Sequence, residues 1–463
     1  MPYRWRVLLV QWLFGWGGPF HIAGAVVVLP FAQMDLGVSR SAIAWLVVAF
    51  SMTTASFVLP AAYLGNAWSR RKMVVIGATL EALSQIGLFL VPGFTWLIPI
   101  RMLGGLGNAM ILANLPPLVV LAYPPERRGR ALGLMGFGTG WGMLLSSVIA
   151  GLLADTLGWR YLFLTTSSMY VALALAGILV VKDAPAQERR PISMARFDFM
   201  GLLLIASCII TLAVATQRLG DPSTILLGGG LFILSGALGS SFVIWEWRFS
   251  NPLIDPRLFR QRMLSVTTVY NVGAFLLRQC SYFLLPFYLI QGIGWSGSAA
   301  GAALMAFNLG QPLVSPIAGY VIDRVGAQGP IRISFGLLLL GGLLQLTLGS
   351  SPQVAHILVA LLVLGAGFAV FATASGQVIF GSVPRDKINL AQGVMAVTGH
   401  GTNVVGPALA ATLLRVFASE GIPIAYQRSM MVILGIFVAA VVIGLVLWRR
   451  LDVRPSKALQ PGP

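Results

Sequence analysis

The stretch PPERRGRALGLMGFG, residues 124–138, has a diverged copy 260 residues later, PRDKINLAQGVMAVT, residues 384–398. At the same offset GLGNA, residues 105–109, aligns with GAGFA, residues 365–369. Such self-similarity at a fixed distance is the sequence signature of a repeated structural unit. The first alignment pairs these residues: Pro124 with Pro384, Glu126 with Asp386, Ala131 with Ala391, Gly133 with Gly393, and Met135 with Met395. The chain is therefore expected to consist of two related halves.

Composition indicates what kind of unit is repeated. The chain has 463 residues, of which 57% are hydrophobic and 10% are charged, whereas a soluble chain carries about 25% charged residues. Apolar runs of about 20 residues predict transmembrane helices, and we count fourteen. The first follows Arg4 and Arg6, is too long for a signal peptide and lacks a cleavage site, so we expect an anchored helix. Cys208 and Cys280 both fall in predicted spans, which excludes a disulfide framework and a metal site.

The positive charge has an uneven distribution. Of the 31 Lys and Arg residues, 24 fall on one alternating set of loops, five on the other, and two, Arg101 and Arg278, inside spans. Basic loops stay on the cytoplasmic side of a membrane. We therefore expect a multi-pass protein of the cell membrane with both termini in the cytoplasm. The net charge of +17 then reflects orientation and attraction to membrane lipids, and we expect no nucleic-acid partner.

Six spans per half leave the two halves in the same orientation. We expect an N-terminal six-helix bundle at 1–182, a linker with two extra transmembrane helices at 183–260, and a C-terminal six-helix bundle with a short tail at 261–463. Paired bundles of this kind bind substrate between them and expose it alternately to each side. No GxxxxGK[ST] loop and no sizeable soluble region are present, so we expect neither an enzyme nor a cofactor or metal, and a monomer.

Four motifs carry a resemblance to a known family: RMLGGLGNA from Arg101, GWRYLF from Gly158, FDFMG from Phe197, and NPLIDPRLFRQR from Asn251. With them the chain resembles the major facilitator superfamily, and more narrowly its fourteen-helix branch of drug–proton antiporters. The resemblance implies a major-facilitator fold and proton-coupled export of lipophilic or amphiphilic small molecules, as in multidrug efflux and drug resistance.

Three diagnostic positions differ from that family pattern. His21 occupies the place of the first-helix Asp. Asn66 and Ser69 occupy the Asp and Gly positions of the loop after the second span, and Ser146 and Ser147 replace the Gly-Pro of the antiport motif. The loop after the second span and its copy in the second half resemble a loop of the family that helps to close the inner face. The resemblance implies a gating role for Arg70, Arg71, Asp323 and Arg324.

Ionisable residues inside spans are costly and point to function. For proton coupling the candidates are His21, whose ordinary pKa lies near neutrality, Arg101, which resembles the family's helix-four Arg, and Glu81. Glu81 has an alternative interpretation as a structural group bonded to Gln85. The candidates for the substrate cavity are His21, Arg278, Tyr282, Asn271 and His400.

The charge of these candidates bears on the cargo. A carboxylate site becomes neutral when it is protonated, whereas a histidine site becomes positive, and charge acts strongly where the dielectric constant is low. A neutral-to-positive site argues against cationic cargo. The first hypothesis is proton-coupled export of lipophilic or amphiphilic compounds, and the alternative is anion–proton symport or facilitated diffusion of an anionic amphiphile. A non-transporting membrane sensor is a third possibility that the lack of a signalling domain disfavours.

Overall fold

The computed structural model describes residues 3–123, 128–182, 198–219, 223–249, 252–253, 256–381 and 388–450. The repeated stretches 124–138 and 384–398 therefore lie partly outside the described residues. Within the described part the chain is all-helical and forms fifteen α-helices. Apolar helices suit a bilayer because each satisfies its backbone hydrogen bonds internally.

The first seven helices belong to the N-terminal half of the sequence. They are α1 (Tyr3–Asp35), α2 (Arg40–Ile43), α3 (Trp45–Ala67), α4 (Arg70–Leu90), α5 (Phe94–Leu121), α6 (Arg128–Thr156) and α7 (Tyr161–Val180). Two more, α8 (Phe199–Leu219) and α9 (Ile225–Arg248), pack against each other as a pair.

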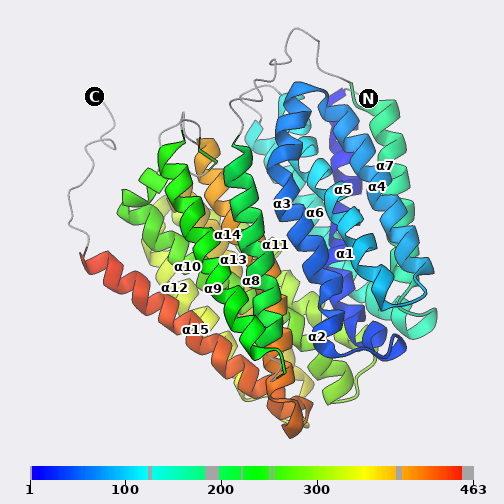
Figure 1. Cartoon of the computed structure of the whole chain (residues 1–463), viewed down its shortest axis with the longest axis vertical. Coiled ribbons are helices and arrows are strands. Elements are labelled where there is room, and N and C mark those ends of the chain that lie inside the picture. Colours follow the sequence, from blue (N-terminus) through cyan, green and yellow to red (C-terminus); the bar gives the residue numbers. More distant parts are fainter. Residues whose placement is uncertain are drawn as a thin grey trace.

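The remaining helices form the C-terminal half. They are α10 (Arg262–Pro286), α11 (Gly297–Val325), α12 (Gln328–Leu346), α13 (Val354–Gly381), α14 (Ile388–Val416) and α15 (Ile422–Arg450). A π-helical segment, Phe287–Gly292, continues α10. Figure 1 shows the helices running side by side, with α2 at the end of the molecule opposite the N-terminus.

Twelve helices of the described chain are long and apolar enough to cross a membrane. The helices α11 and α14 are not among the twelve, although each has 29 residues. Both pack against helices on several sides, α11 against α6 and α13, and α14 against α3, α8 and α10. Small and polar residues suit such protein-facing surfaces. The expected count of fourteen spans is not reached, and it stays a prediction.

The packing of helices follows the same plan in both halves. Helix α1 packs on α6 and α7, and α5 packs on α3 and α4; correspondingly α10 packs on α14 and α15, and α13 packs on α11 and α12. This agrees with the repeat in the sequence. The residue boundaries of the three expected regions remain a prediction.

The halves meet along two seams, α6 against α11 and α3 against α14. Helix α8 packs on both α3 and α14, so the α8–α9 pair covers the second seam (Figure 1). At the first seam the backbones touch, because a Cβ atom on Gly301 would overlap the carbonyl oxygen of Ser147. Only glycine permits so close an approach.

Polar contacts join the halves at the end where α1 finishes. Nε of Arg40 donates to Oε1 of Gln291 at 3.2 Å. The carboxylate of Asp155 on α6 accepts hydrogen bonds from the backbone N–H groups of Gly297 and Ser298, both at 2.7 Å. Those groups are orphan donors at the N-terminus of α11, which a negative charge stabilises. This end of the molecule is therefore closed between the halves.

Candidate functional site

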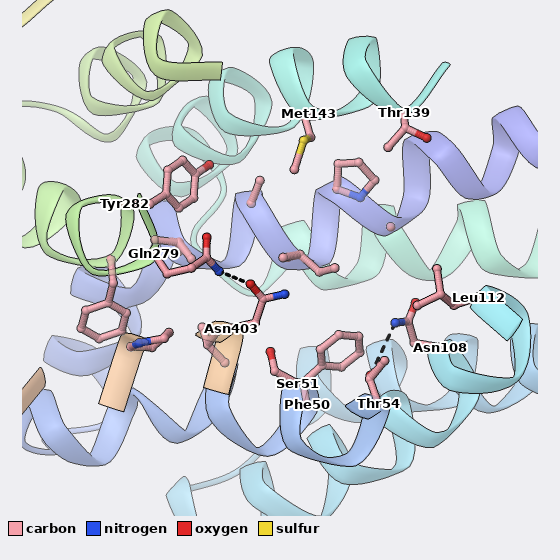
Figure 2. Close-up of a pocket in the computed structure, with 18 of the residues that line it drawn as sticks. Phe50, Ser51, Thr54, Asn108, Leu112, Thr139, Met143, Gln279, Tyr282 and Asn403 are labelled. Atoms are coloured by element: carbon pink, nitrogen blue, oxygen red, sulfur yellow. Dashed lines mark hydrogen bonds between the residues drawn. The ribbon is translucent and has the colours of Figure 1, made fainter. Parts of the chain in front are cut away.

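A cavity of about 260 Å³ lies between the halves. Helices α1, α3, α5 and α6 line one side, and α10 and α14 line the other. Most of the wall is apolar, and Figure 2 shows the polar side chains that interrupt it, together with Phe50 and Met143. Of the residues lining it in the described chain, Arg278 alone carries a formal charge.

Arg278 is held at the C-terminal side of the cavity. Its guanidinium lies over the ring of Phe368 at 4.6 Å, and Nη1 donates to Oε1 of Gln279 at 3.0 Å. Nε2 of Gln279 then donates to Oδ1 of Asn403 at 2.5 Å (Figure 2). Both contacts are made by the guanidinium itself. The positive charge remains beside the cavity, where it attracts anionic or electron-rich groups.

Tyr282 joins the halves inside the cavity wall. Its hydroxyl lies 3.2 Å from the hydroxyl of Ser147 on α6, and it accepts a hydrogen bond from Nδ2 of Asn308 at 3.3 Å. Ser147 occupies a position that the family pattern gives to proline. A proline side chain has no hydroxyl and could not make this bond. The difference in sequence therefore adds a polar contact between the halves.

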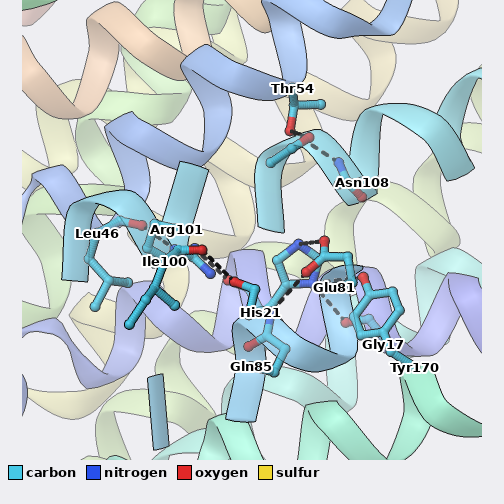
Figure 3. Close-up of polar contacts among 12 residues, drawn as sticks. Gly17, His21, Leu46, Thr54, Glu81, Gln85, Ile100, Arg101, Asn108 and Tyr170 are labelled. Carbon is cyan, nitrogen blue, oxygen red and sulfur yellow. Dashed lines mark hydrogen bonds and ion pairs between the residues drawn. The ribbon is translucent and has the colours of Figure 1, made fainter. Parts of the chain in front are cut away.

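A second group of polar residues is buried within the N-terminal half, on the other side of α1 from the cavity. His21, Glu81 and Arg101 have exposed fractions of 0%, 0% and 1%. Nε2 of His21 lies 3.6 Å from Oε1 of Glu81, and Figure 3 shows the two facing each other. We call His21, Glu81, Gln85, Arg101 and Tyr170 the buried polar cluster.

Each nitrogen of His21 has a defined environment. Nδ1 lies 3.0 Å from the hydroxyl of Tyr170 and 3.1 Å from the carbonyl oxygen of Gly17. It can accept from the first or donate to the second, depending on the tautomer. Within the described residues, neither Nε2 of His21 nor Oε1 of Glu81 has a hydrogen-bond partner. A proton shared between these two atoms would therefore give each of them a hydrogen-bond partner.

Glycines place Glu81 in this position. The helices α4 and α5 lie so close that a Cβ atom on Gly107 would stand 2.5 Å from the carbonyl oxygen of Gly77. Glu81 follows one helical turn after Gly77 and so reaches the interior of the half. Nε2 of Gln85, four residues later on the same face, donates to Oε2 of Glu81 at 3.1 Å. The expected bond to Gln85 is confirmed, but it occupies only one carboxylate oxygen.

Arg101 binds backbone rather than a carboxylate. Nε donates to the carbonyl oxygen of Leu46 at 2.6 Å, and Nη2 donates to that of His21 at 3.2 Å. Its guanidinium lies 4.6 Å from the centre of the Phe50 ring. The ring of His21 meets the same phenylalanine edge-on at 4.6 Å. Because Phe50 also lines the cavity, its ring separates the cavity from the buried polar cluster.

The structure brings only some of the predicted residues together. Arg278 and Tyr282 line the cavity. His21 does not line it, since its imidazole points into the N-terminal half, while Asn271 is 1% exposed and also lies away from it. The assignment of these two residues to the substrate cavity stays a prediction. The side chain of His400 lies outside the described residues.

The expected gate residues have local partners. Arg71 donates to the carbonyl oxygens of Gly177 and Ile178 at the end of α7, within its own half. Arg324 stacks on Tyr320 of its own helix at 4.2 Å, and Arg70 also has a partner. The side chain of Asp323 lies outside the described residues. A gating role for these four residues remains a prediction.

Several residues of the site are not among those predicted from the sequence. Phe50, Asn108, Gln279 and Asn403 line the cavity, and Tyr170 completes the buried polar cluster. Polar residues in the middle of apolar runs were the signal available for Asn108, Gln279 and Asn403. No signal distinguishes Phe50 from the other phenylalanines, because its role comes from its position between two sites.

Known proteins resemble the chain over nearly all its length. The model of the family described as Major Facilitator Superfamily matches residues 13–245 and 267–463. The chain belongs to the major facilitator superfamily. Members of this superfamily are secondary transporters and not enzymes, so the chain is a multi-pass membrane transporter of a small molecule, as expected at that level.

Two relatives and one structure illustrate the range of this superfamily. Multidrug resistance protein Stp of Mycobacterium tuberculosis is 28% identical over 87% of this chain and 74% of its own length. Riboflavin transporter RibZ of Clostridioides difficile is 24% identical over 84% of this chain and 83% of its own. A POT family transporter in complex with 5-aminolevulinic acid superposes with a TM-score of 0.71 at 16% identity, covering 95% of this chain and 96% of that one. The structural likeness shows the fold alone.

Proposed function

We propose that this protein exports lipophilic or amphiphilic small molecules in exchange for protons, as a member of the fourteen-helix drug–proton antiporter branch. The observation that carries the proposal is the cavity between the halves, lined by helices of both. Rocking of two bundles about such a site exposes it alternately to each side. The similarity to Stp, a protein named for multidrug resistance, supports the proposal.

We propose that protons bind in the buried polar cluster. Glu81 supplies the carboxylate that the first helix lacks, and it faces His21 across 3.6 Å. Protonation of this pair removes the negative charge of the carboxylate and leaves the neighbouring cation of Arg101 unbalanced. Charge acts strongly in a buried site, so this step can change the packing of α1 and α3, whose carbonyl groups bind Arg101.

Proton and substrate would then occupy different sites. The cavity wall includes Phe50, and the far side of the same ring contacts Arg101 and His21. A charge change in the buried polar cluster reaches the cavity through this ring and through α1. Because the proton and the substrate then do not compete for one carboxylate, the transported molecule need not be cationic. Arg278 favours neutral or anionic amphiphiles.

The orientation follows from the basic loops. We propose that both termini face the cytoplasm, that α11 and α14 also span the membrane, and that 1–182, 183–260 and 261–463 are the three regions of a monomer. The end closed by Arg40 and Asp155 is then the extracellular side, and the cavity is in an inward-facing arrangement. Basic residues at the cytoplasmic end would contact membrane lipids.

The alternative is symport of an anion with a proton, which the positive charge of Arg278 in the cavity wall favours. Proteoliposomes under an imposed pH gradient separate the two. Export coupled to protons predicts that amphiphile movement runs against the proton flow. Anion movement in the same direction as protons would favour the alternative, and flux that ignores the gradient would contradict both coupled mechanisms.

A further inference from the structure

Two pairs of hydrogen-bonding residues in the cavity, one in each half, have opposite character. Figure 2 shows Asn403 and Gln279 toward one side of the cavity and Asn108 toward the other. Asn403 and Gln279 belong to α14 and α10, and Asn108 and its partner Thr54 belong to α5 and α3. Figure 2 shows Phe50 between these groups, and most of the remaining wall is apolar.

In the C-terminal half the direction of the hydrogen bonds is set by an arginine. Arg278 can only donate, so Gln279 turns its carbonyl oxygen toward it. The amide nitrogen of Gln279 then donates to Oδ1 of Asn403. Nδ2 of Asn403 makes no hydrogen bond to any residue of the described chain. This side of the cavity therefore offers donors, namely an amide nitrogen and a guanidinium.

In the N-terminal half the direction is set by a backbone carbonyl. The hydroxyl of Thr54 donates to the carbonyl oxygen of Gly105 at 3.1 Å, so only its lone pairs remain available. Nδ2 of Asn108 donates to that hydroxyl oxygen at 3.4 Å. Oδ1 of Asn108 is left buried and has no partner in the described part of the chain. Asn108 itself lines the cavity, so a residue of this wall carries an unpaired acceptor.

A buried acceptor without a partner is costly, and a ligand that supplies a donor removes the cost. We infer that the substrate is a two-headed amphiphile: an anionic or strongly accepting group binds at Arg278 and Asn403, a hydroxyl or N–H group binds at Asn108, and an apolar body lies between them. This inference rests on the proposed function, because it describes the ligand of the same cavity. Such a ligand contacts both halves at once, whereas a ligand with only one of the two polar groups binds a polar site in one half alone.

Four naphthalene derivatives test the inference by isothermal titration calorimetry on the purified full-length protein. 6-Hydroxy-2-naphthoate has both groups, 6-methoxy-2-naphthoate lacks the donor, methyl 6-hydroxy-2-naphthoate lacks the charge, and 2-methoxynaphthalene lacks both. The first is expected to bind about tenfold more tightly than either singly altered compound, since each lost contact to a buried polar group costs about 1–2 kcal/mol.

Two variants assign the preferences to their residues. Asn108→Leu is expected to abolish the preference for hydroxyl over methoxyl and to retain the preference for the acid, whereas Arg278→Gln is expected to do the reverse. Thr166→Val is the control, because Thr166 is buried on α7 away from the cavity lining and its hydroxyl donates to Leu162 of its own helix; it should change neither preference. Variants are compared only when their melting temperatures match the wild type, and the ligand series on the wild type stands without them.

Equal affinity of the wild type for all four compounds overturns the inference and leaves the cavity as a binding site. A preference for the hydroxyl that survives Asn108→Leu also overturns it. If none of the four compounds binds, the cavity is not the site of amphiphile binding, and the proposed function fails together with the inference.

Discussion

Nε2 of His21 on α1 and Oε1 of Glu81 on α4 face each other at 3.6 Å in the interior of the N-terminal half, and both side chains are 0% exposed. The pair consists of two groups that bind protons, each lacking another hydrogen-bond partner at that atom in the described chain. Buried titratable pairs of this kind are rare in membrane helices, and their presence points to a functional site.

Glu81→Gln tests the carboxylate of the pair. Glutamine has the same shape and can still bond Gln85, so we expect a folded protein whose substrate affinity changes less than about twofold, while pH-driven flux falls at least about tenfold. Proteoliposome flux and calorimetry measure the two quantities. Asp198→Asn is the control, because Asp198 is also buried but binds Trp245 and Gly201 outside the cluster. Full pH-driven flux in Glu81→Gln would exclude Glu81 as the proton carrier.

His21→Gln tests the imidazole. A neutral amide cannot take up a proton, so the dependence of transport on pH should flatten if the imidazole is part of the proton site. Initial rates of flux at a series of pH values measure this. Tyr170→Phe removes only the hydroxyl next to Nδ1 and should leave a pH-dependent profile. A profile for His21→Gln that matches the wild type would assign the pH dependence to another group.

Phe50→Leu tests the connection between the two sites. A smaller side chain no longer contacts Arg101 and His21 together, so substrate binding should lose its dependence on pH while affinity at one fixed pH changes less than about fivefold. Calorimetric titrations at two pH values give both numbers. Phe283→Leu is the matched control, since Phe283 lines the cavity but packs on Phe287 of its own half. Retained linkage in Phe50→Leu would show that α1 alone transmits the change.

Asp155→Asn tests the contact that closes one end. Asparagine keeps at most one of the two bonds to the N-terminus of α11 and loses the charge, which weakens the closed arrangement by about 1–3 kcal/mol. Spin labels are placed at Leu157 and Val354, exposed positions in the two halves. Double electron–electron resonance should then show a larger fraction of molecules with a long distance between the labels. Glu420→Gln breaks a pair with Arg428 inside one half and should leave the distances unchanged. A distance distribution identical to the wild type would mean that Asp155 does not hold this end closed.

Much of the fold follows from the sequence, because span length and the internal repeat depend on local composition. The direction in which His21 points cannot be predicted from the sequence, because α1 is apolar on all sides and the spacing of its apolar residues selects no face. The approach of Glu81 to His21 depends on Gly77 and Gly107, which bring α4 close to α5. The glycines are visible in the sequence, but their partner across the helix interface is not.

The unequal covering of the two seams has a consequence for the route that the cargo takes. Helices α8 and α9 lie over the α3–α14 seam, and Thr412 on α14 donates to the carbonyl oxygen of Thr216 on α8 at 2.6 Å. In the described chain no extra helix pair covers the α6–α11 seam. A molecule dissolved in the acyl chains of the bilayer therefore meets a shielded flank on one side of the transporter and an open one on the other. Two-fold pseudosymmetry within the protein thus coexists with one-sided exposure to the lipid phase.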